Sequence, residues 1–264
     1  MSNPAEGYES YMVPTLFGPW ATKLIEAANP KGGERVLDVG CGTGIVARQV
    51  AARLGESGEI TGLDLSSSML AVARATAATE GVTVAWHEGS AEHLPFPEAS
   101  FDLVLCQFAL MFFVDRPAAL AEIHRVVAED GRVLMSVWQS LDRHPFYKTL
   151  HEVIQRRLGM SALQEIFSLG NTEKLRDLLA GSGFLGVEIE PISMTARFPN
   201  PDGFLAGEIE VDTAAIPSMQ KLGAQARQAI VADVSAEMES PLKEVTHDNH
   251  VVLQFHALVA RAWR

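Results

Sequence analysis

One stretch of the chain decides its fold: Val36-Leu37-Asp38-Val39-Gly40-Cys41-Gly42-Thr43-Gly44. A short apolar run leads into three glycines at alternate positions, and a helical pattern over Ile45–Leu54 follows. Glycine permits a tight turn and removes the Cβ atom that would hold a ligand away from the backbone. The first turn of the following helix has unpaired N–H groups and a partial positive charge, which suit an anionic group. The stretch therefore predicts a strand, a ligand-binding turn and a helix.

Strand-like and helix-like segments alternate on both sides of this stretch. The expected strands are Arg35–Val39, Ile60–Asp64, Thr83–His87, Leu103–Cys106 and Arg132–Val137. Helical spacing of apolar residues falls between them, as at Ile45–Leu54 and Ala118–Val127. Such alternation is typical of a mostly parallel sheet with right-handed crossovers, and the nearly continuous apolar strands indicate helices on both faces. We therefore predict a doubly wound α/β fold.

The pattern changes after Trp138. The later segments are expected to be helices at Pro145–Leu158 and Thr172–Ala180, a strand at Val187–Phe198, mostly helix at Phe204–Glu239 and a closing strand at Val251–Ala262. The helical material is too long for simple connections and predicts a cap over the ligand-binding edge. We expect an N-terminal helical segment at 1–30, a cofactor-binding core at 31–140, and the remainder of the sheet at 141–264. The insertions in that remainder are expected at about 141–180 and 200–240.

Composition narrows the class of protein. The 264 residues include 21 Lys and Arg against 33 Asp and Glu, a net charge of −12, which argues against a nucleic-acid partner. Two cysteines, Cys41 and Cys106, are too few for a disulfide scaffold or a zinc site and indicate a reducing compartment. No run reaches the roughly 18 apolar residues of a membrane span. The composition predicts a cytoplasmic protein without bound metal or membrane contact, and it leaves the oligomeric state open.

Asp64 gives the second chemical signal, because it ends the expected strand Ile60–Asp64. An acidic residue there can accept hydrogen bonds from the ribose hydroxyls of a nucleoside. The run from Gly42 to Ala47 also matches the dinucleotide pattern G-x-G-x-x-A, which leaves a nicotinamide cofactor as an alternative. In that pattern the first glycine follows the strand directly, and counting from Gly40 puts bulky Ile45 at the sixth position. The register favours one nucleoside with an amino-acid tail.

These residues resemble a known family. Val36–Gly44 is similar to the first motif of class I S-adenosylmethionine-dependent methyltransferases. The further motifs are resembled by Gly62-Leu63-Asp64-Leu65-Ser66 with Met69-Leu70, by Gly89-Ser90-Ala91-Glu92 with Leu94-Pro95-Phe96, and by Ser100-Phe101-Asp102. The match runs from about Gly33 to Val137 and looks most like the ubiquinone/menaquinone-biosynthesis type. It implies a seven-stranded, Rossmann-like sheet, the cofactor S-adenosylmethionine and methyl transfer to a small, largely apolar molecule.

The resemblance also implies roles for individual residues. The positions implied to contact the cofactor are Tyr11, Asp38, Gly40, Gly42, Gly44, Asp64, Leu65, Met69, Ser90, Ala91, Gln107 and Phe108. The methionine tail would lie along the glycines and Asp38, the ribose on Asp64, and the adenine by Leu65, Met69, Ser90 and Ala91. Gln107 and Phe108 would face the reactive methyl, and Tyr11 would fold over the cofactor. The structural alternatives are a helix cap for Asp64, core packing for Met69 and a satisfied amide for Gln107.

No catalytic residue follows from the sequence. A weakly acidic acceptor needs a general base, and His144 is a candidate because it follows the fifth strand; His250 and His256 flank the last strand. An apolar pocket could be lined by Phe112, Phe113, Phe146, Phe167, Phe204 and Met219. Two functions remain beside methyl transfer. One is a nicotinamide-dependent oxidoreductase, although no Tyr-x-x-x-Lys is present, and the other is a binding module that has lost catalysis.

Overall fold

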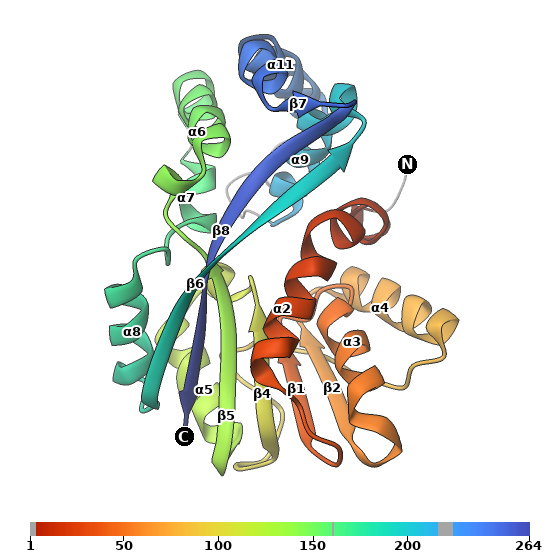
Figure 1. Ribbon diagram of the computed structural model, residues 1–264, viewed down its shortest axis with the longest axis vertical. Helices are drawn as coiled ribbons and strands as arrows, with labels where there is room; N and C mark the ends of the chain where they lie inside the picture. Colours follow the sequence, from red (N-terminus) through yellow and green to blue (C-terminus); the bar gives the residue numbers. More distant parts are fainter. Residues whose placement is uncertain (1–3, 160, 216–223) are drawn as a thin grey trace. The chain divides into compact units, whose positions relative to one another are not determined.

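The computed structural model describes residues 4–159, 161–215 and 224–264 (Figure 1). The chain divides into two compact units. Unit 1 comprises Met1–Val137, Asn171–Pro191 and Leu258–Arg264, and unit 2 comprises Trp138–Gly170 and Ile192–Ala257. Two long strands contribute residues to both units, β6 (Leu185–Pro199) and β8 (His250–Trp263). The expected site residues from Tyr11 to Phe108 all belong to unit 1.

The strands follow the order β3-β2-β1-β4-β5-β8-β6 (Figure 1). The first five along the chain are β1 (Arg35–Val39), β2 (Glu59–Asp64), β3 (Ala85–Glu88), β4 (Phe101–Gln107) and β5 (Val127–Trp138). They pair in parallel wherever they are neighbours. The order reverses between β1 and β4, and open α/β sheets bind ligands at the carboxyl ends of strands beside such a reversal. The seven strands of this order correspond to the seven strands expected from the sequence. Among the described residues the sheet has an eighth, β7 (Thr246–His247), which pairs with β8.

The central strands of unit 1 are fully buried. Val36, Leu37 and Val39 of β1 and Leu103–Cys106 of β4 have no accessible surface. Strands flanked by helices on both faces need such continuous apolar runs. The covering helices of unit 1 are α2 (Gly18–Ala28), α3 (Ile45–Leu54), α4 (Ser67–Glu80), α5 (Arg116–Val126) and α8 (Thr172–Gly181). Helix α3 packs on β1 and β2, α4 packs on β2 and β3, and α2 contacts α3 and β4.

Local signals set the helix ends. The Ser66 hydroxyl accepts a hydrogen bond from Met69 N at 3.3 Å, so Ser66 is the N-cap and α4 begins at Ser67. Gly81 ends α4 in the left-handed region, with φ of 70°. Asp115 caps α5 through a 3.0 Å hydrogen bond from Ala118 N. Two short turns follow strands or helices, η2 (Gly55–Ser57) and η3 (Leu110–Phe112).

Unit 2 is mainly helical. Its elements are η4 (Leu141–Arg143), α6 (Pro145–Leu158), α7 (Ala162–Ile166), α9 (Pro201–Ala215) and α11 (Ala224–Glu244), with β7 and parts of β6 and β8. Helix α6 packs on α7 and α11, and α9 packs on α11. Its aromatic side chains contact one another, as Phe198 and Phe204 do at a ring-centroid distance of 5.0 Å. The helix expected at Phe204–Glu239 corresponds to α9 and α11. No helix in the described ranges combines the length and apolarity of a membrane span.

Candidate cofactor-binding site

The turn between β1 and α3 has the conformation that its glycines predict. Gly40, Gly42 and Gly44 have φ angles of 69°, 55° and 85°, in the region that other residues seldom adopt. Gly40 N and Cys41 N both donate to the Leu63 carbonyl, at 2.8 and 3.0 Å, which fixes the turn beside the end of β2. The turn therefore lies at the carboxyl edge of the sheet.

The three glycines face different surroundings. A Cβ atom on Gly40 would overlap the Cβ of Ala109, from the loop after β4. A Cβ on Gly44 would overlap the indole of Trp86, from β3. A Cβ on Gly42 would meet no atom within 4 Å. Gly40 and Gly44 are thus required by packing inside the protein, and Gly42 alone of the three leaves open space beside the backbone.

Asp64 is fixed against this space. Its Oδ2 accepts a hydrogen bond from Gly42 N at 2.7 Å, and its Oδ1 accepts one from Ser66 N at 2.8 Å. Burial raises the pKa of Asp64 above its ordinary value, although these backbone bonds oppose the shift. The carboxylate is therefore held in one orientation at the end of β2, next to the open side of Gly42. Asp64 itself does not cap α4, since Ser66 does.

Asp38 lies deeper in the unit. It is 1% exposed, and its Oδ2 accepts a hydrogen bond from Ala47 N, in the first turn of α3, at 3.1 Å. Burial and, to a smaller extent, the nearby charge of Asp64 raise its pKa to about 7, and that hydrogen bond opposes the shift. The hydrogen bond joins the end of β1 to the start of α3, so Asp38 holds the two sides of the glycine turn together.

An N-terminal helical segment, α1 (Pro4–Gly7) and the π-helix η1 (Tyr8–Phe17), adds residues to the same edge. Burial raises the pKa of the Tyr8 hydroxyl, and the carboxylates of Asp64, Glu9 and Asp38 raise it further. Tyr8 therefore lies among the acidic groups of the site and stacks on Phe17, with ring centroids 5.1 Å apart. Tyr11, which the sequence suggested, is half-buried in the same π-helix. Tyr8 was missed, although it lies one turn away in the same aromatic segment.

A buried arginine ties this segment to the glycine turn. Arg48, on α3, has a side chain only 3% exposed. It pairs with Glu9 of η1 at 2.6 Å and with Glu80 of α4 at 3.0 Å, and it donates to the Thr43 carbonyl within the turn. Because these groups come from four parts of unit 1, the arginine fixes the N-terminal segment over the turn. The sequence reasoning did not identify this network.

The loops after β3 and β4 supply the remaining expected residues. The Ser90 hydroxyl bonds to the Glu92 carboxylate, whose Oε1 accepts from Val114 N at 3.0 Å. Burial alone would raise the pKa of Glu92, but these bonds lower it below the ordinary value. Ala91 is 5% exposed and packs inside the loop. Glu92 thus orients Ser90, and it also belongs to a motif noted in the sequence.

Gln107 ends β4, and Phe108 follows it. The Gln107 side chain donates from Nε2 to the Phe17 carbonyl at 3.1 Å, while its Oε1 is buried and has no hydrogen-bond partner among the described residues. Phe108 has a φ of 50°, unusual for a residue with a side chain, and its ring meets Trp20 edge-on at 5.5 Å. The amide of Gln107 therefore retains an unused acceptor at the carboxyl end of β4.

Leu65 and Met69 follow Asp64. Leu65 is 74% exposed, which is unusual for a leucine beside a buried carboxylate, and Met69 is half-buried in the first turn of α4. Both carry apolar surface at the edge where β2 ends. The family resemblance implied that both side chains flank the adenine. Neither side chain is fully buried in the core, so both keep accessible apolar surface at this edge.

The sequence of the chain is similar to those of known methyltransferases. A family model described as a methyltransferase domain matches residues 36–131. The ubiquinone/menaquinone biosynthesis C-methyltransferase of Cupriavidus pinatubonensis is 38% identical over 128 residues, which are 47% of this chain and 53% of that protein. The protein of the same name from Neisseria meningitidis serogroup B is 32% identical over 186 residues, 66% of this chain and 76% of that protein. The chain belongs to the class I S-adenosylmethionine-dependent methyltransferases.

Both of these relatives are named as ubiquinone/menaquinone biosynthesis C-methyltransferases, the type that the motifs of this chain resemble. The chain spans about half the length of the Cupriavidus relative. Solved structures agree on the fold: the YcgJ protein of Bacillus subtilis matches with a TM-score of 0.62 and 19% identity, over 92% of this chain and 97% of that one. A phosphoethanolamine N-methyltransferase of Haemonchus contortus, solved with S-adenosylhomocysteine, matches with a TM-score of 0.57 and 21% identity, over 93% and 52%. The predicted α/β methyltransferase fold is confirmed.

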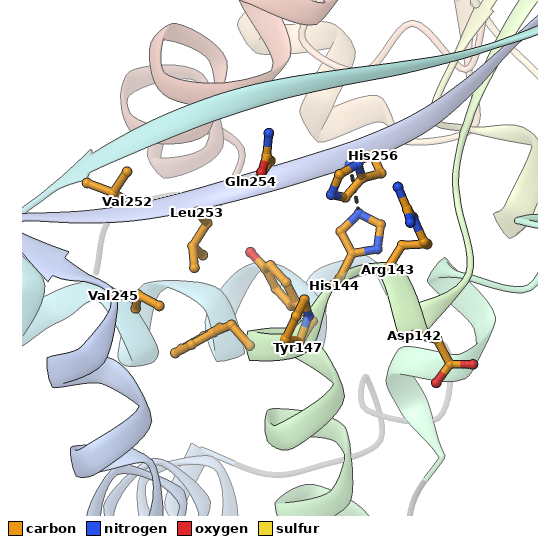
Figure 2. Close-up of a pocket in the computed structure, with 11 residues that line it drawn as sticks. Asp142, Arg143, His144, Tyr147, Val245, Val252, Leu253, Gln254 and His256 are labelled. Atoms are coloured by element: carbon orange, nitrogen blue, oxygen red, sulfur yellow. Dashed lines mark hydrogen bonds between the residues drawn. The ribbon is translucent and has the colours of Figure 1, made fainter.

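Unit 2 of this methyltransferase contains a pocket of about 500 Å³ (Figure 2). Its walls come from η4, the start of α6, the end of the α11 region and β8, and they comprise Asp142, Arg143, His144, Pro145, Phe146, Tyr147, Val245, Val252, Leu253, Gln254 and His256. Of the aromatic residues proposed for an apolar pocket, Phe146 lines this one. Phe167 and Phe204 are buried elsewhere in unit 2, Phe112 and Phe113 belong to unit 1, and Met219 lies outside the described residues.

His144 has both ring nitrogens engaged. Its Nε2 accepts a hydrogen bond from His256 N at 3.0 Å (Figure 2). Its Nδ1 therefore carries the proton and donates to the Ser140 carbonyl at 3.2 Å. Burial lowers its pKa to about 4. In this arrangement His144 joins α6 to the middle of β8 and has no free lone pair with which to accept a proton. The sequence offered His144 as a base, and the hydrogen bonds give it a structural role.

Proposed function

We propose that this chain binds S-adenosylmethionine at the turn between β1 and α3 and transfers its methyl group to a small, largely apolar molecule. The observation that carries the proposal is the open space beside Gly42. The carboxylate of Asp64 is held next to this space by the 2.7 Å hydrogen bond from Gly42 N to its Oδ2. A bare backbone next to a fixed acceptor suits a nucleoside with a polar tail. A relative of the same family covers two thirds of the chain, which supports the same cofactor.

The residues at this edge suit the proposed cofactor in charge and shape. Asp64 has oxygens that could accept from the ribose hydroxyls, and Leu65 and Met69 offer apolar surface for the adenine. The unused Oε1 of Gln107 could accept from the ammonium group of the methionine part. Each of these contacts remains a prediction for the residue concerned.

The chemistry expected of the cofactor is a methyl group already activated by the positive sulfur. The protein then has to align the acceptor with that methyl and keep water out, and orientation alone contributes on the order of 7 kcal/mol to such a reaction. The N-terminal segment tied down by Arg48 is suited to excluding water at this edge. The apolar acceptor follows from the family resemblance. The cytoplasmic location and the absence of nucleic-acid partners stay predictions from the composition.

Calorimetric titration with S-adenosylmethionine, S-adenosylhomocysteine, NAD and NADP tests the cofactor. We expect saturable binding of the first two and none of the nicotinamide nucleotides. Formation of S-adenosylhomocysteine with a panel of phenols, quinols and amines then tests the reaction. Binding of both adenosyl compounds without turnover on any acceptor would favour a module without catalysis. Preferential binding of NAD or NADP would contradict the proposal.

A further inference from the structure

The pocket of unit 2 has a charged end and an apolar end. Figure 2 shows Asp142 and Arg143 at the charged end of the wall, and Val245, Val252 and Leu253 toward the apolar end. All of the lining residues belong to unit 2, so the pocket does not depend on where unit 1 lies. Its volume of about 500 Å³ is within the range that holds small molecules. This distribution of charge suits a ligand with one ionic and one apolar part.

Arg143 is held at the charged end by the chain on both sides of it. It is the last residue of η4, and its backbone N–H donates to the Ser140 carbonyl at 2.9 Å. The next residue, His144, is fixed to Ser140 and to His256 through its two ring nitrogens, and Pro145 then begins α6. Because a closed turn precedes Arg143 and an anchored histidine follows it, the backbone at Arg143 has a fixed position.

The guanidinium of Arg143 carries a positive charge that no anion neutralises in the described part of the chain. Its side chain forms no ion pair with another described residue. Burial lowers the pKa of His256, and the nearby charge of Arg143 lowers it further. A guanidinium keeps its proton at every pH at which proteins fold. The charged end therefore presents a permanent cation beside an imidazole that is mainly neutral at pH 7.

Other charged groups around the pocket are already engaged. The Asp142 carboxylate pairs with Lys148 at 2.6 Å, and Figure 2 shows it pointing away from Arg143. The Tyr147 hydroxyl donates to Glu208 Oε2 at 2.8 Å. Glu208 is 3% exposed and is not among the lining residues, and burial raises its pKa to about 7 against that hydrogen bond. Since Asp142 and Lys148 neutralise each other, Arg143 leaves the charged end with a net positive charge.

The apolar end offers carbon surface. Leu253 and Phe146 are buried, and Val245 and Val252 are half-buried. Phe146 is held in place by its ring contact with Phe204, at a centroid distance of 5.8 Å. Each methylene group that a ligand removes from water against this surface stabilises the complex. An aliphatic chain therefore suits this end, whereas a sugar or a second ionic group does not.

We propose that this pocket binds a small monocarboxylate with an aliphatic chain. Its carboxylate pairs with Arg143, and its chain lies against Val252 and Leu253. A planar guanidinium forms two parallel hydrogen bonds with a carboxylate, which a hydroxyl group cannot reproduce. One guanidinium does not balance a phosphate dianion. The site goes beyond the proposed methyl transfer and does not rest on it.

The net charge of the chain makes this selection sharper. The protein carries a formal charge of −12, so its overall field repels acids and attracts cations. An acid that binds here is therefore held by a local cation and by apolar contact, and an organic cation of the same length would be favoured everywhere except at Arg143. Replacing the charge of this one side chain should thus reverse the preference of the pocket.

The test uses the full chain and octanoate as the probe. The matched probes are 1-octanol and octylammonium, which have the same chain and lack the negative charge. Dissociation constants are measured by ligand-observed NMR titration at neutral pH. We expect saturable binding of octanoate and binding of 1-octanol that is weaker by roughly fivefold, the factor that a partly exposed ion pair contributes. Octylammonium should not bind in this pocket, and butanoate should bind more weakly than octanoate because it leaves the apolar end empty.

Variants of Arg143 give the sharper result. Arg143→Met should weaken octanoate binding roughly fivefold and leave 1-octanol binding unchanged. Arg143→Glu should reverse the preference, so that octylammonium binds more tightly than octanoate. The matched control is Arg197→Met, which removes an exposed arginine of unit 2 outside the pocket lining and should behave as the unaltered protein. Arg143 is exposed, so these substitutions leave the core intact.

Three results would overturn the inference: no saturable binding of octanoate, equal affinity for octanoate and 1-octanol, or octanoate affinity that is unchanged in both Arg143 variants. S-adenosylhomocysteine is titrated into the same proteins and should bind all of them equally. Failure of the proposed function has a different signature, because S-adenosylhomocysteine would then not bind while octanoate binding still followed Arg143.

Discussion

Gly42→Ala is the sharpest perturbation of the cofactor site, because it adds one methyl group at the position that the structure leaves open. The new Cβ meets no protein atom within 4 Å. Gly40→Ala and Gly44→Ala are unsuitable for this purpose, since their Cβ atoms would overlap Ala109 and Trp86 and damage the fold itself. Only at Gly42 does a methyl group separate the effect on a ligand from the effect on packing.

The expected cost to folding is small. Gly42 has a φ of 55°, and an alanine in the left-handed region costs about 1–2 kcal/mol. Alanine also restricts the unfolded chain, which returns about 0.4–1 kcal/mol. The net loss should therefore be about 1 kcal/mol. A ligand lying against the bare backbone would instead meet the methyl group directly, and we expect its affinity to fall at least tenfold, about 1.4 kcal/mol.

The matched control is Gly81→Ala. Gly81 ends α4 with a φ of 70°, and its Cβ would also meet nothing within 4 Å. The two variants therefore carry the same backbone strain in equally open surroundings. Urea unfolding gives the stability of each, and calorimetry with S-adenosylhomocysteine gives the affinity. The two should lose similar stability, and only Gly42→Ala should lose binding.

Equal affinity in both variants would refute the reasoning, because the space beside Gly42 would then not hold the ligand. A large loss of stability in Gly42→Ala alone would also refute it, since the turn would then be packed more closely than the structure has it.

Three further predictions follow from the same edge of the sheet. Asp64→Ala should weaken S-adenosylhomocysteine binding at least tenfold by calorimetry, through loss of a charge-assisted acceptor; unchanged affinity would remove Asp64 from the ribose role. Because the folded-state pKa of Asp38 is raised to about 7, its stabilising contribution is complete below about pH 4 and is lost as the pH rises to 7. Between pH 5 and 8 the free energy of unfolding should therefore fall by about 3 kcal/mol from this group, and Asp38→Asn should remove that part of the fall in urea titrations; an unchanged pH slope would contradict it. Arg48→Met should leave Glu9 unpaired and increase protease cleavage within the first 17 residues, whereas the exposed Lys23→Met should not.

Local sequence signals predicted unit 1 well. The bounds of β1 and α3 are those expected, because the apolar run and the glycines that limit them lie next to one another in the sequence. The prediction for β3 began two residues too early, since Val82 N bonds the Ala77 carbonyl at 2.9 Å and its segment completes the end of α4. The prediction for β5 began five residues too late. The strand continues back to Val127, which pairs with Phe101 across an irregularity that the apolar pattern does not reveal.

The site itself was only partly predictable. The sequence shows three equivalent glycines, and their separate roles depend on Ala109, from the loop after β4, and Trp86, from β3. Tyr8 and Tyr11 are likewise equal candidates on composition. The choice between them depends on the phase of a π-helix that contains Pro14. A sequence pattern with a regular helical period does not give that phase.

The pair of Tyr147 and Glu208 shows where sequence reasoning ends for physical reasons. Glu208 lies in a helix with other acidic residues, and no local pattern distinguishes it from a solvated carboxylate. Its burial and its raised pKa arise from packing against α6, whose Tyr147 is 61 positions away. The cofactor motifs are local and identify the chemistry that the family shares. A buried contact made by tertiary packing can differ between proteins that carry the same motifs, because the residues of the glycine turn do not specify it. The motifs of unit 1 therefore identify the cofactor chemistry of the family, and contacts such as this one are found only from the folded structure.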